Sequence, residues 1–162
     1  MRIALVSDSH GKIPGELLGA IAGADRIFHL GDLGPVHLLY ELETVAPVAA
    51  VQGNNDAPGQ SELPPLRRFE ESGVHFHLRH FPWNEHSMLQ ATAPSIFLHG
   101  HTHKPRIEEV PLGFQVCPGS LRLPRGGFPP SYAWIILEDA SLRISLRSLQ
   151  TREIIDERIA KL

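Results

Sequence analysis

Aspartate, asparagine and histidine residues recur in this sequence directly after short apolar runs. The run at residues 96–98 is followed by His99-Gly100-His101-Thr102-His103, in which two imidazoles stand at alternate positions. Residues two apart in extended chain point to the same face, so His101 and His103 can converge on one point. Neutral imidazole is the most common metal-binding side chain, and Gly100 lets the backbone leave the strand sharply. The pattern therefore predicts a metal site at the carboxyl end of a strand.

The same pattern follows four other apolar runs. Residues 3–6 lead into Asp8 and His10, residues 26–30 into Asp32, residues 48–52 into Asn54, Asn55 and Asp56, and the run from Val74 ends in His80. In an open sheet built from crossovers, ligands bind beyond the carboxyl ends of the strands, so these loops can share one cleft. Oxygen and imidazole donors without thiolate suit divalent ions such as Mn²⁺, Fe or Zn²⁺. The donors exceed what one ion needs, which favours two ions about 3.5–4 Å apart bridged by a carboxylate.

Alternating strands and helices in the first half of the chain would position the earlier loops. Apolar runs at residues 3–6, 26–30 and 48–52 predict strands, and Pro14 and Pro35 are each followed by leucines at helical spacing. Strand, helix, strand, helix, strand is typical of right-handed crossovers in a mainly parallel sheet.

The second half predicts antiparallel hairpins, which would position the later histidines. Three pairs of apolar runs flank turn residues at 72–73, 111–113 and 138–139. Proline-rich residues 57–65 predict a loop, residues 88–91 one helical turn, and residues 151–162 a terminal helix.

Composition excludes several classes of protein. The 162 residues, 42% hydrophobic and 20% charged, suit one globular domain over residues 1–162, with residues 151–162 as a candidate C-terminal extension. A net charge of −3 gives no strong nucleic-acid signature. The single cysteine, Cys117, excludes a disulfide framework and a cysteine-rich zinc module. No apolar run reaches the roughly 20 residues of a membrane span, and Asp8 comes too early for a signal peptide. We expect a cytoplasmic protein, and the sequence leaves a homo-oligomer open.

In this order, the motifs resemble those of the calcineurin-like metallophosphoesterases. They are Asp8-x-His10, Gly31-Asp32, Gly53-Asn54-Asn55-Asp56, a histidine after a strand, and Gly100-His101-Thr102-His103. The length and Pro118-Gly119-Ser120 are most similar to the small YfcE-like bacterial phosphodiesterases. The resemblance implies an α/β fold, a four-layer α/β/β/α sandwich of two mixed sheets flanked by helices.

The resemblance also implies a site and a reaction. Asp8, His10, Asp32 and His103 would hold the first metal, Asp32 would bridge, and Asn54, His80 and His101 would complete the second. The implied cofactors are two divalent ions, manganese first and Fe, Zn, Ni or Co as alternatives. A hydroxide held by the metals would attack a small phosphoester or nucleotide-like substrate, most often a phosphodiester. The residues expected to take part in catalysis are Asn54, Asn55, Asp56 and His101.

Two departures from the family leave alternatives open. Many members have histidine at the position of Asn55, where it can protonate the leaving group. The histidine matched to His80 is normally followed by glycine, whereas here Phe81-Pro82-Trp83 follows, so His77 and His86 are alternative ligands.

The sequence also leaves two other functions open. Two competing functions are an interaction scaffold, the character of a retromer subunit that resembles this family, and a mononuclear metal hydrolase. His29 would orient a ligand, and Arg122 and Arg125 are read as surface residues that could also meet a substrate phosphate.

Overall fold

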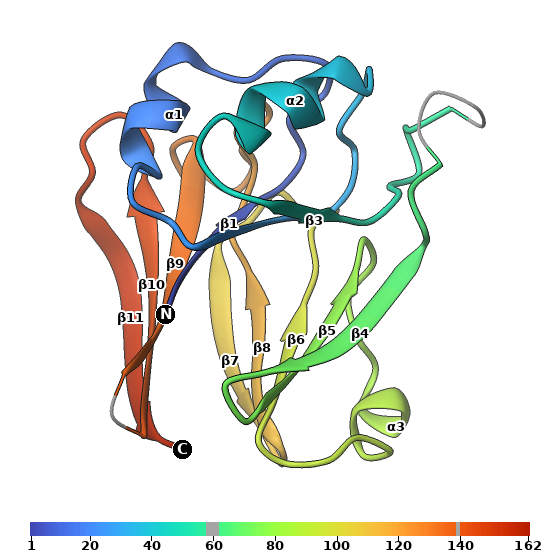
Figure 1. Cartoon of the computed structure of the whole chain (residues 1–162), viewed down its shortest axis with the longest axis vertical. Helices are drawn as coiled ribbons and strands as arrows, with labels where there is room; N and C mark the ends of the chain where they lie inside the picture. Colours follow the sequence, from blue (N-terminus) through green and yellow to red (C-terminus); the bar gives the residue numbers. More distant parts are fainter. Residues whose placement is uncertain (58–61, 139) are drawn as a thin grey trace.

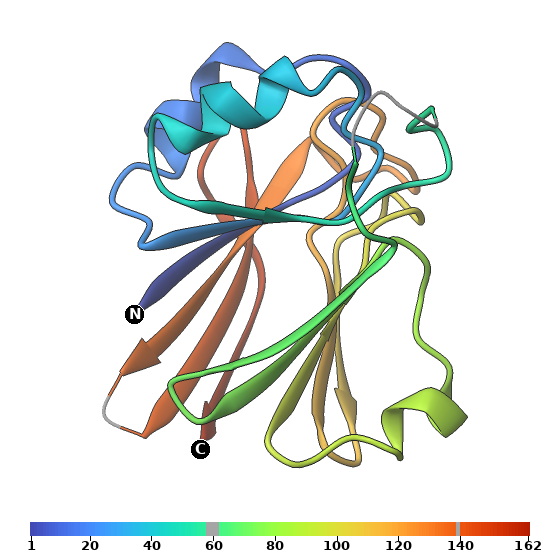
Figure 2. The same ribbon diagram turned by 45° about the vertical axis from the view of Figure 1, so that its right-hand side comes forward.

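Two β-sheets face each other in the computed structural model, which describes residues 1–57, 62–138 and 140–162 (Figures 1 and 2). The first sheet has six strands in the order β11-β10-β9-β1-β2-β3. Strands β1 to β3 are parallel, and β9 to β11 add antiparallel to their edge. The bounds are β1 Arg2–Val6, β2 Arg26–His29, β3 Val48–Ala50, β9 Ser131–Glu138, β10 Ser141–Ser148 and β11 Ile154–Lys161.

The second sheet has five strands in the order β4-β5-β6-β8-β7. Strands β5, β6 and β8 are parallel, whereas β4 and β7 are joined to their neighbours as antiparallel hairpins. The bounds are β4 Leu66–Glu71, β5 Val74–Arg79, β6 Ser95–Leu98, β7 Arg106–Val110 and β8 Gly113–Cys117. Both sheets are therefore mixed.

The core lies in layers because side chains alternate along each strand. On β1, Ile3 and Leu5 point into the core between the two sheets, whereas Ala4 and Val6 point outward under the helices. Helices α1 (Gly15–Ala20) and α2 (His37–Glu43) bury Leu17, Leu38 and Leu42 against that outer face (Figure 2). A strand buried on both faces explains why the run at residues 3–6 is apolar throughout.

The outer face of the second sheet carries a smaller third cluster. Phe97 of β6 packs there with Trp83 and with Met88 of helix α3 (Glu85–Met88). The order helix, sheet, sheet, helix confirms the predicted four-layer sandwich, with a thin fourth layer.

The helix predicted for residues 151–162 is wrong, because residues 154–161 form edge strand β11. Ile155 and Ala160 of this strand pack against the core between the sheets. The strand pairs antiparallel with β10, and the register shifts at a bulge between Leu146 and Arg147. Pairing with β10 thus outweighed the weak intrinsic secondary-structure propensity of this segment.

Other boundaries differ by a few residues. The predicted helical turn lies at 85–88 rather than 88–91, because Asn84 caps it and accepts a 2.9 Å hydrogen bond from the Ser87 N–H. All three predicted hairpins are present. Residues 58–61 of the predicted loop and Asp139 of the last turn lie outside the described residues. In the part of the chain that the structure describes, no helix is long and apolar enough to cross a membrane.

Candidate metal centre

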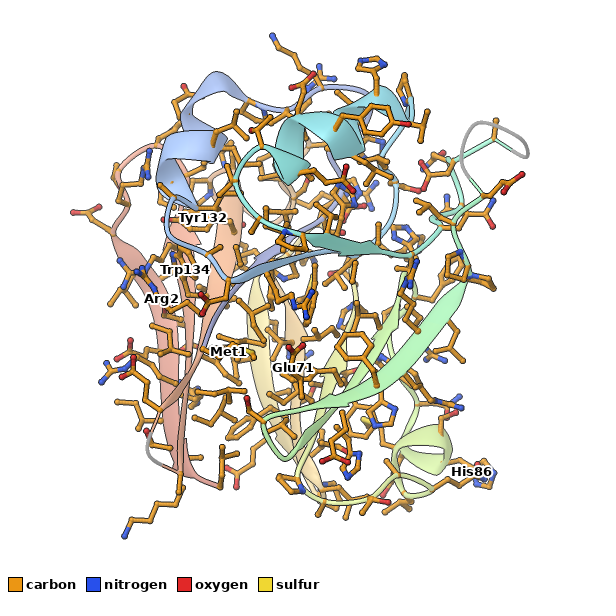
Figure 3. All side chains as sticks on the ribbon, viewed as in Figure 1. Met1, Arg2, Glu71, His86, Tyr132 and Trp134 are labelled. Carbon is orange, nitrogen blue, oxygen red and sulfur yellow. The ribbon has the colours of Figure 1, made fainter. Side chains whose placement is uncertain are left out.

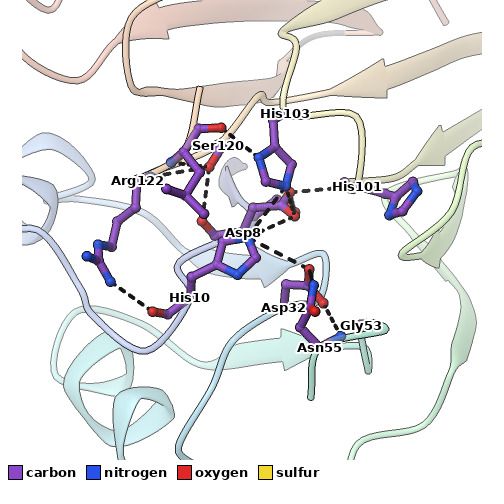
Figure 4. Close-up of polar contacts among 12 residues, drawn as sticks. Asp8, His10, Asp32, Gly53, Asn55, His101, His103, Ser120 and Arg122 are labelled. Atoms are coloured by element: carbon purple, nitrogen blue, oxygen red, sulfur yellow. Dashed lines mark hydrogen bonds and ion pairs between the residues drawn. The ribbon is translucent and has the colours of Figure 1, made fainter. Parts of the chain in front are cut away.

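Four side chains from three separate loops meet at the carboxyl ends of the strands (Figure 4). Asp8 and His10 follow β1, Asp32 follows β2, and His103 follows β6. Each offers one ligand atom, and these atoms all lie within 4.8 Å of one another. Asp8, Asp32 and His103 are buried. The group coincides with the first-metal set expected from the sequence.

The imidazole rings of His80 and His103 are oriented by backbone carbonyls. His80 Nδ1 lies 2.7 Å from the Leu30 carbonyl oxygen, and His103 Nδ1 lies 2.6 Å from that of Leu123. Because a carbonyl can only accept, each Nδ1 donates to its carbonyl and each ring turns its Nε2 toward the carboxylates. His80 Nε2 then faces Asp32 Oδ2 at 3.5 Å, and His103 Nε2 faces Asp8 Oδ1 at 3.0 Å.

Buried polar atoms without a hydrogen-bond partner mark the same spot. Among the described residues, Asp8 Oδ1 and His80 Nε2 are two of the three such atoms. His10 Nε2 lies 3.4 Å from His103 Nε2 and 3.8 Å from Asp32 Oδ2. Two carboxylates and three imidazole nitrogens thus crowd one buried spot, with Asp8 Oδ1 and His80 Nε2 left without hydrogen-bond partners, and a cation there would satisfy both atoms. The donor set therefore fits divalent metal ions.

Backbone conformation at the site is strained. Five of its residues adopt the left-handed region that non-glycine residues rarely enter: Asp8 (φ 55°), His10 (φ 44°), Asp32 (φ 53°), His101 (φ 65°) and His103 (φ 59°). Each such residue costs of the order of 1 kcal/mol and persists only where the surroundings impose it. Concentration of this strain on the proposed ligands points to function.

Two glycines allow the loops to approach each other closely. A Cβ at Gly53 would overlap the backbone and carboxylate of Asp32, and one at Gly100 would overlap the Ser7 hydroxyl and lie 2.8 Å from Asp8 Oδ2. These positions need glycine because any side chain would push the carboxylates out of place.

The two carboxylates differ in their electrostatics. Burial raises the pKa of Asp8, and the neighbouring Asp32 raises it further despite the Ser7 hydrogen bond and two histidines. Burial would also raise the pKa of Asp32, but His80 and two hydrogen bonds from Asn55 outweigh it and hold that pKa below its usual range. A cation bound between the carboxylates would offset the cost of ionising Asp8.

Asn54, His80 and His101 lie beside this group, and His80 links them to it through Asp32. His101 Nδ1 lies 3.0 Å from Asn54 Oδ1, and the rings of His80 and His101 meet edge to face with centroids 5.2 Å apart. These are the residues expected from the sequence to hold a second metal; only the set of Asp8, His10, Asp32 and His103 meets the 4.8 Å spacing among the described residues, so the second set stays a prediction. Burial lowers the pKa of His101, so the ring is a neutral donor.

Asn55 and Asp56 lie beside the donors but are held by hydrogen bonds. The Asn55 backbone N–H and side-chain amide donate to the two oxygens of Asp32, at 2.8 and 2.6 Å (Figure 4). The Asp56 carboxylate accepts from the Gly34 and Gly53 N–H groups, each at 2.8 Å. Both residues line a cleft of about 270 Å³ next to His10 and Asp32.

The two alternatives to His80 lie outside the cluster. His77 packs on the outer face of the second sheet, where its ring stacks on Phe97 at 4.7 Å and meets the Ser95 hydroxyl at 3.2 Å. His86 is exposed on α3 at the far end of the molecule (Figure 3). His29 is buried behind the site, where its Nε2 meets the Ser9 hydroxyl at 3.0 Å.

Two serines without a predicted role, together with Arg122, support the site from behind. The Ser7 hydroxyl donates to Asp8 Oδ2 at 2.6 Å, and the buried Ser120 hydroxyl donates to the Asp8 carbonyl at 3.0 Å. Arg122 donates to the His10 carbonyl at 2.9 Å. Serine is common everywhere in proteins, so only the position of Ser7 directly before Asp8 could have signalled its part.

Known proteins share both the sequence and the fold. Residues 1–140 match the model of the calcineurin-like phosphoesterase superfamily domain. A probable metallophosphoesterase from Methanothermobacter thermautotrophicus is 34% identical over 137 residues, covering 77% of this chain and 80% of the relative. Phosphodiesterase YfcE from Escherichia coli K12 is 30% identical over 166 residues, covering 83% and 87%.

Solved structures agree. The E. coli YfcE phosphoesterase has a TM-score of 0.77 at 26% identity and covers 98% of both chains. Vps29 from Entamoeba histolytica, solved with Zn²⁺, has a TM-score of 0.77 at 21% identity and covers 99% of both, which shows the fold alone. The motifs, the sandwich and the clustered donors thus share one explanation, which is that this chain belongs to the calcineurin-like phosphoesterase superfamily.

Proposed function

We propose that this protein is a dinuclear metal-dependent phosphodiesterase. The observation that carries the proposal is the cluster of Asp8, His10, Asp32 and His103, with His80 facing the Asp32 carboxylate from the other donors' side at 3.5 Å. Similarity to phosphodiesterase YfcE over 83% of the chain supports the diester preference. Oxygen and imidazole donors favour manganese, with Fe, Zn, Ni or Co as alternatives.

The chain's own residues would divide the work. Asp8, His10 and His103 would hold one ion, Asn54, His80 and His101 would hold the other, and Asp32 would serve both. When bound, the two ions supply a water of lowered pKa as nucleophile and neutralise charge on the phosphoryl oxygens. Asn55 keeps Asp32 ionised and oriented, while Asp56 fixes the loop through the Gly34 and Gly53 N–H groups.

One experiment tests the proposal directly. Protein reconstituted with Mn²⁺ should bind two ions per chain, counted by mass spectrometry of the metal content, and hydrolyse bis(4-nitrophenyl) phosphate faster than 4-nitrophenyl phosphate. One ion per chain would point to the mononuclear hydrolase. Two ions without hydrolysis of any phosphoester would favour the scaffold.

An interaction scaffold is the second candidate because Vps29 structures share the fold. The donor set weighs against it, since a scaffold has no need of buried carboxylate and imidazole atoms left without hydrogen-bond partners. A single domain over residues 1–162, a cytoplasmic location and a homo-oligomer stay predictions.

A further inference from the structure

The ring of Phe81 lies at the edge of the metal centre and is 50% exposed. Its centroid lies 4.7 Å from the His101 ring and 5.4 Å from the His80 ring. One side of Phe81 therefore packs on two proposed ligands of the second ion, while the rest of the ring faces solvent. A single exposed phenylalanine is ordinary on a protein surface, so its surroundings must decide its role.

The backbone that carries Phe81 is fixed by Arg79. The Arg79 guanidinium donates to the Phe81 carbonyl at 2.8 Å and also to the Pro82 carbonyl. The same guanidinium lies 4.1 Å above the ring of Trp83, which is buried against Phe97. A proline with a fixed φ follows Phe81 directly. The ring thus stands on a rigid support and loses little conformational entropy on binding.

We propose that Phe81 determines specificity by stacking on a planar aromatic group in the ester that stays on the phosphorus, either an aryl alcohol or a nucleobase. The inference rests on the proposed function, because a phosphodiester at the metal centre would place one of its ester groups beside His101. The half-exposed ring of Phe81 lies next to His101 and could therefore stack on an aromatic ring in that ester group. Stacking of this kind contributes about 1 kcal/mol or more, which corresponds to about 5- to 10-fold in affinity.

Diesters that share one leaving group test the proposal without changing the chemical step. Phenyl 4-nitrophenyl phosphate, thymidine 5′-(4-nitrophenyl) phosphate and methyl 4-nitrophenyl phosphate all release nitrophenolate. Phe81→Ala should lower kcat/KM about 5- to 10-fold, mainly through KM, for at least one diester whose retained group carries a ring, and less than twofold for the methyl diester, whose retained group has none. Loss with the thymidine diester alone would identify a nucleobase as the occupant; loss with the phenyl diester would identify an aryl group.

Further variants separate stacking from support of His101. Phe81→Tyr should keep the preference, whereas Phe81→Leu, which retains apolar bulk, should lose it as Phe81→Ala does. Leu89→Ala removes an apolar side chain that is 54% exposed in the loop after α3 and should change nothing. Equal losses on all three diesters, or fewer than two ions per chain in Phe81→Ala, would overturn the proposal.

Binding without hydrolysis gives an independent readout. Calorimetry should show phenylphosphonate binding to the Mn²⁺-loaded protein about 5- to 10-fold more tightly than methylphosphonate, and Phe81→Ala should remove that difference. Equal affinities in the wild type would sink the stacking role. If no diester is hydrolysed but the phosphonate preference is present and depends on Phe81, the proposed function fails while the aromatic contact stands.

Discussion

His80 and His77 lie three residues apart, yet they occupy opposite environments. His80 follows β5 at its carboxyl end, where its Nε2 faces Asp32, and contact with Asp32 and the Leu30 carbonyl raises its pKa despite burial. His77 points from the middle of β5 into the aromatic cluster on the outer face, where burial lowers its pKa to about 4. Chain position relative to the strand end, not residue type, decides which imidazole serves the site.

The largest expected effect comes from the one carboxylate shared by both donor groups. Asp32→Asn removes the negative charge that both ions need, so we expect loss of both metals and a fall in hydrolysis of at least about 10³-fold. Metal content and initial rates measure this, and circular dichroism serves as the control for folding. Retention of both metals and most of the rate would show that Asp32 does not bridge.

The comparison between the two histidines is tested by alanine substitution. His80→Ala should weaken binding of the second ion by about 10²-fold or more, because a ligand is lost outright and ligand-orienting residues alone are worth 10–100-fold. His77→Ala and His86→Ala should stay within about threefold of the wild type in the same Mn²⁺ titration. A loss confined to His86→Ala would transfer the ligand to α3.

Much of this site could be predicted from the sequence because each donor directly follows an apolar run that forms a strand. Asp8 and Asp32 follow neighbouring parallel strands and so meet at one edge of the first sheet, and His103 follows β6 of the second sheet, which faces the first. The fold could also be predicted, since the helices of crossovers and the strands of hairpins each give a characteristic spacing of apolar residues in the sequence. Residues 154–161 could not, because their pairing with β10 is a tertiary choice invisible in their own sequence.

What sequence could not decide were contacts between distant loops. His77 stays an alternative to His80 until the register of β5 places His77 on the outer face and His80 beyond the strand end. The role of Ser120 depends on a hydrogen bond to a carbonyl 112 positions away. The engagement of Asn55 with Asp32 arises in the same way.

Asn55 gives the third prediction, which concerns the leaving group. An amide held on Asp32 cannot supply a proton at neutral pH, and positioned acid catalysis is typically worth ~10²–10⁴-fold. Hydrolysis should therefore slow steeply as the pKa of the leaving alcohol rises, so that nitrophenyl diesters react much faster than alkyl ones. Rates across a series of aryl diesters measure the slope, with Asn55→Ala as the control that should keep it. A shallow slope, with chemistry shown to limit the rate, would mean that another residue protonates the leaving group.

The smallest expected effect concerns His77, which lies in the aromatic cluster on the outer face. Its protonation should change the stability of the protein at acid pH and leave the chemistry unaffected. Its pKa of about 4 in the folded protein lies below the value of about 6.5 in the unfolded chain. The unfolded state therefore binds a proton first as pH falls, so the stability due to neutral His77 is complete above about pH 6.5 and is lost towards pH 4. His77→Gln removes that titration while keeping a polar group near Ser95. Relative to this variant, the wild type should lose about 1–3 kcal/mol of its free energy of unfolding between pH 7 and 4. Urea unfolding of the metal-free proteins at each pH measures the difference, and the buried His29 and His99, common to both, cancel. Parallel pH profiles would mean that His77 accepts its proton without leaving the aromatic cluster, and the contrast with His80 would then rest on geometry alone.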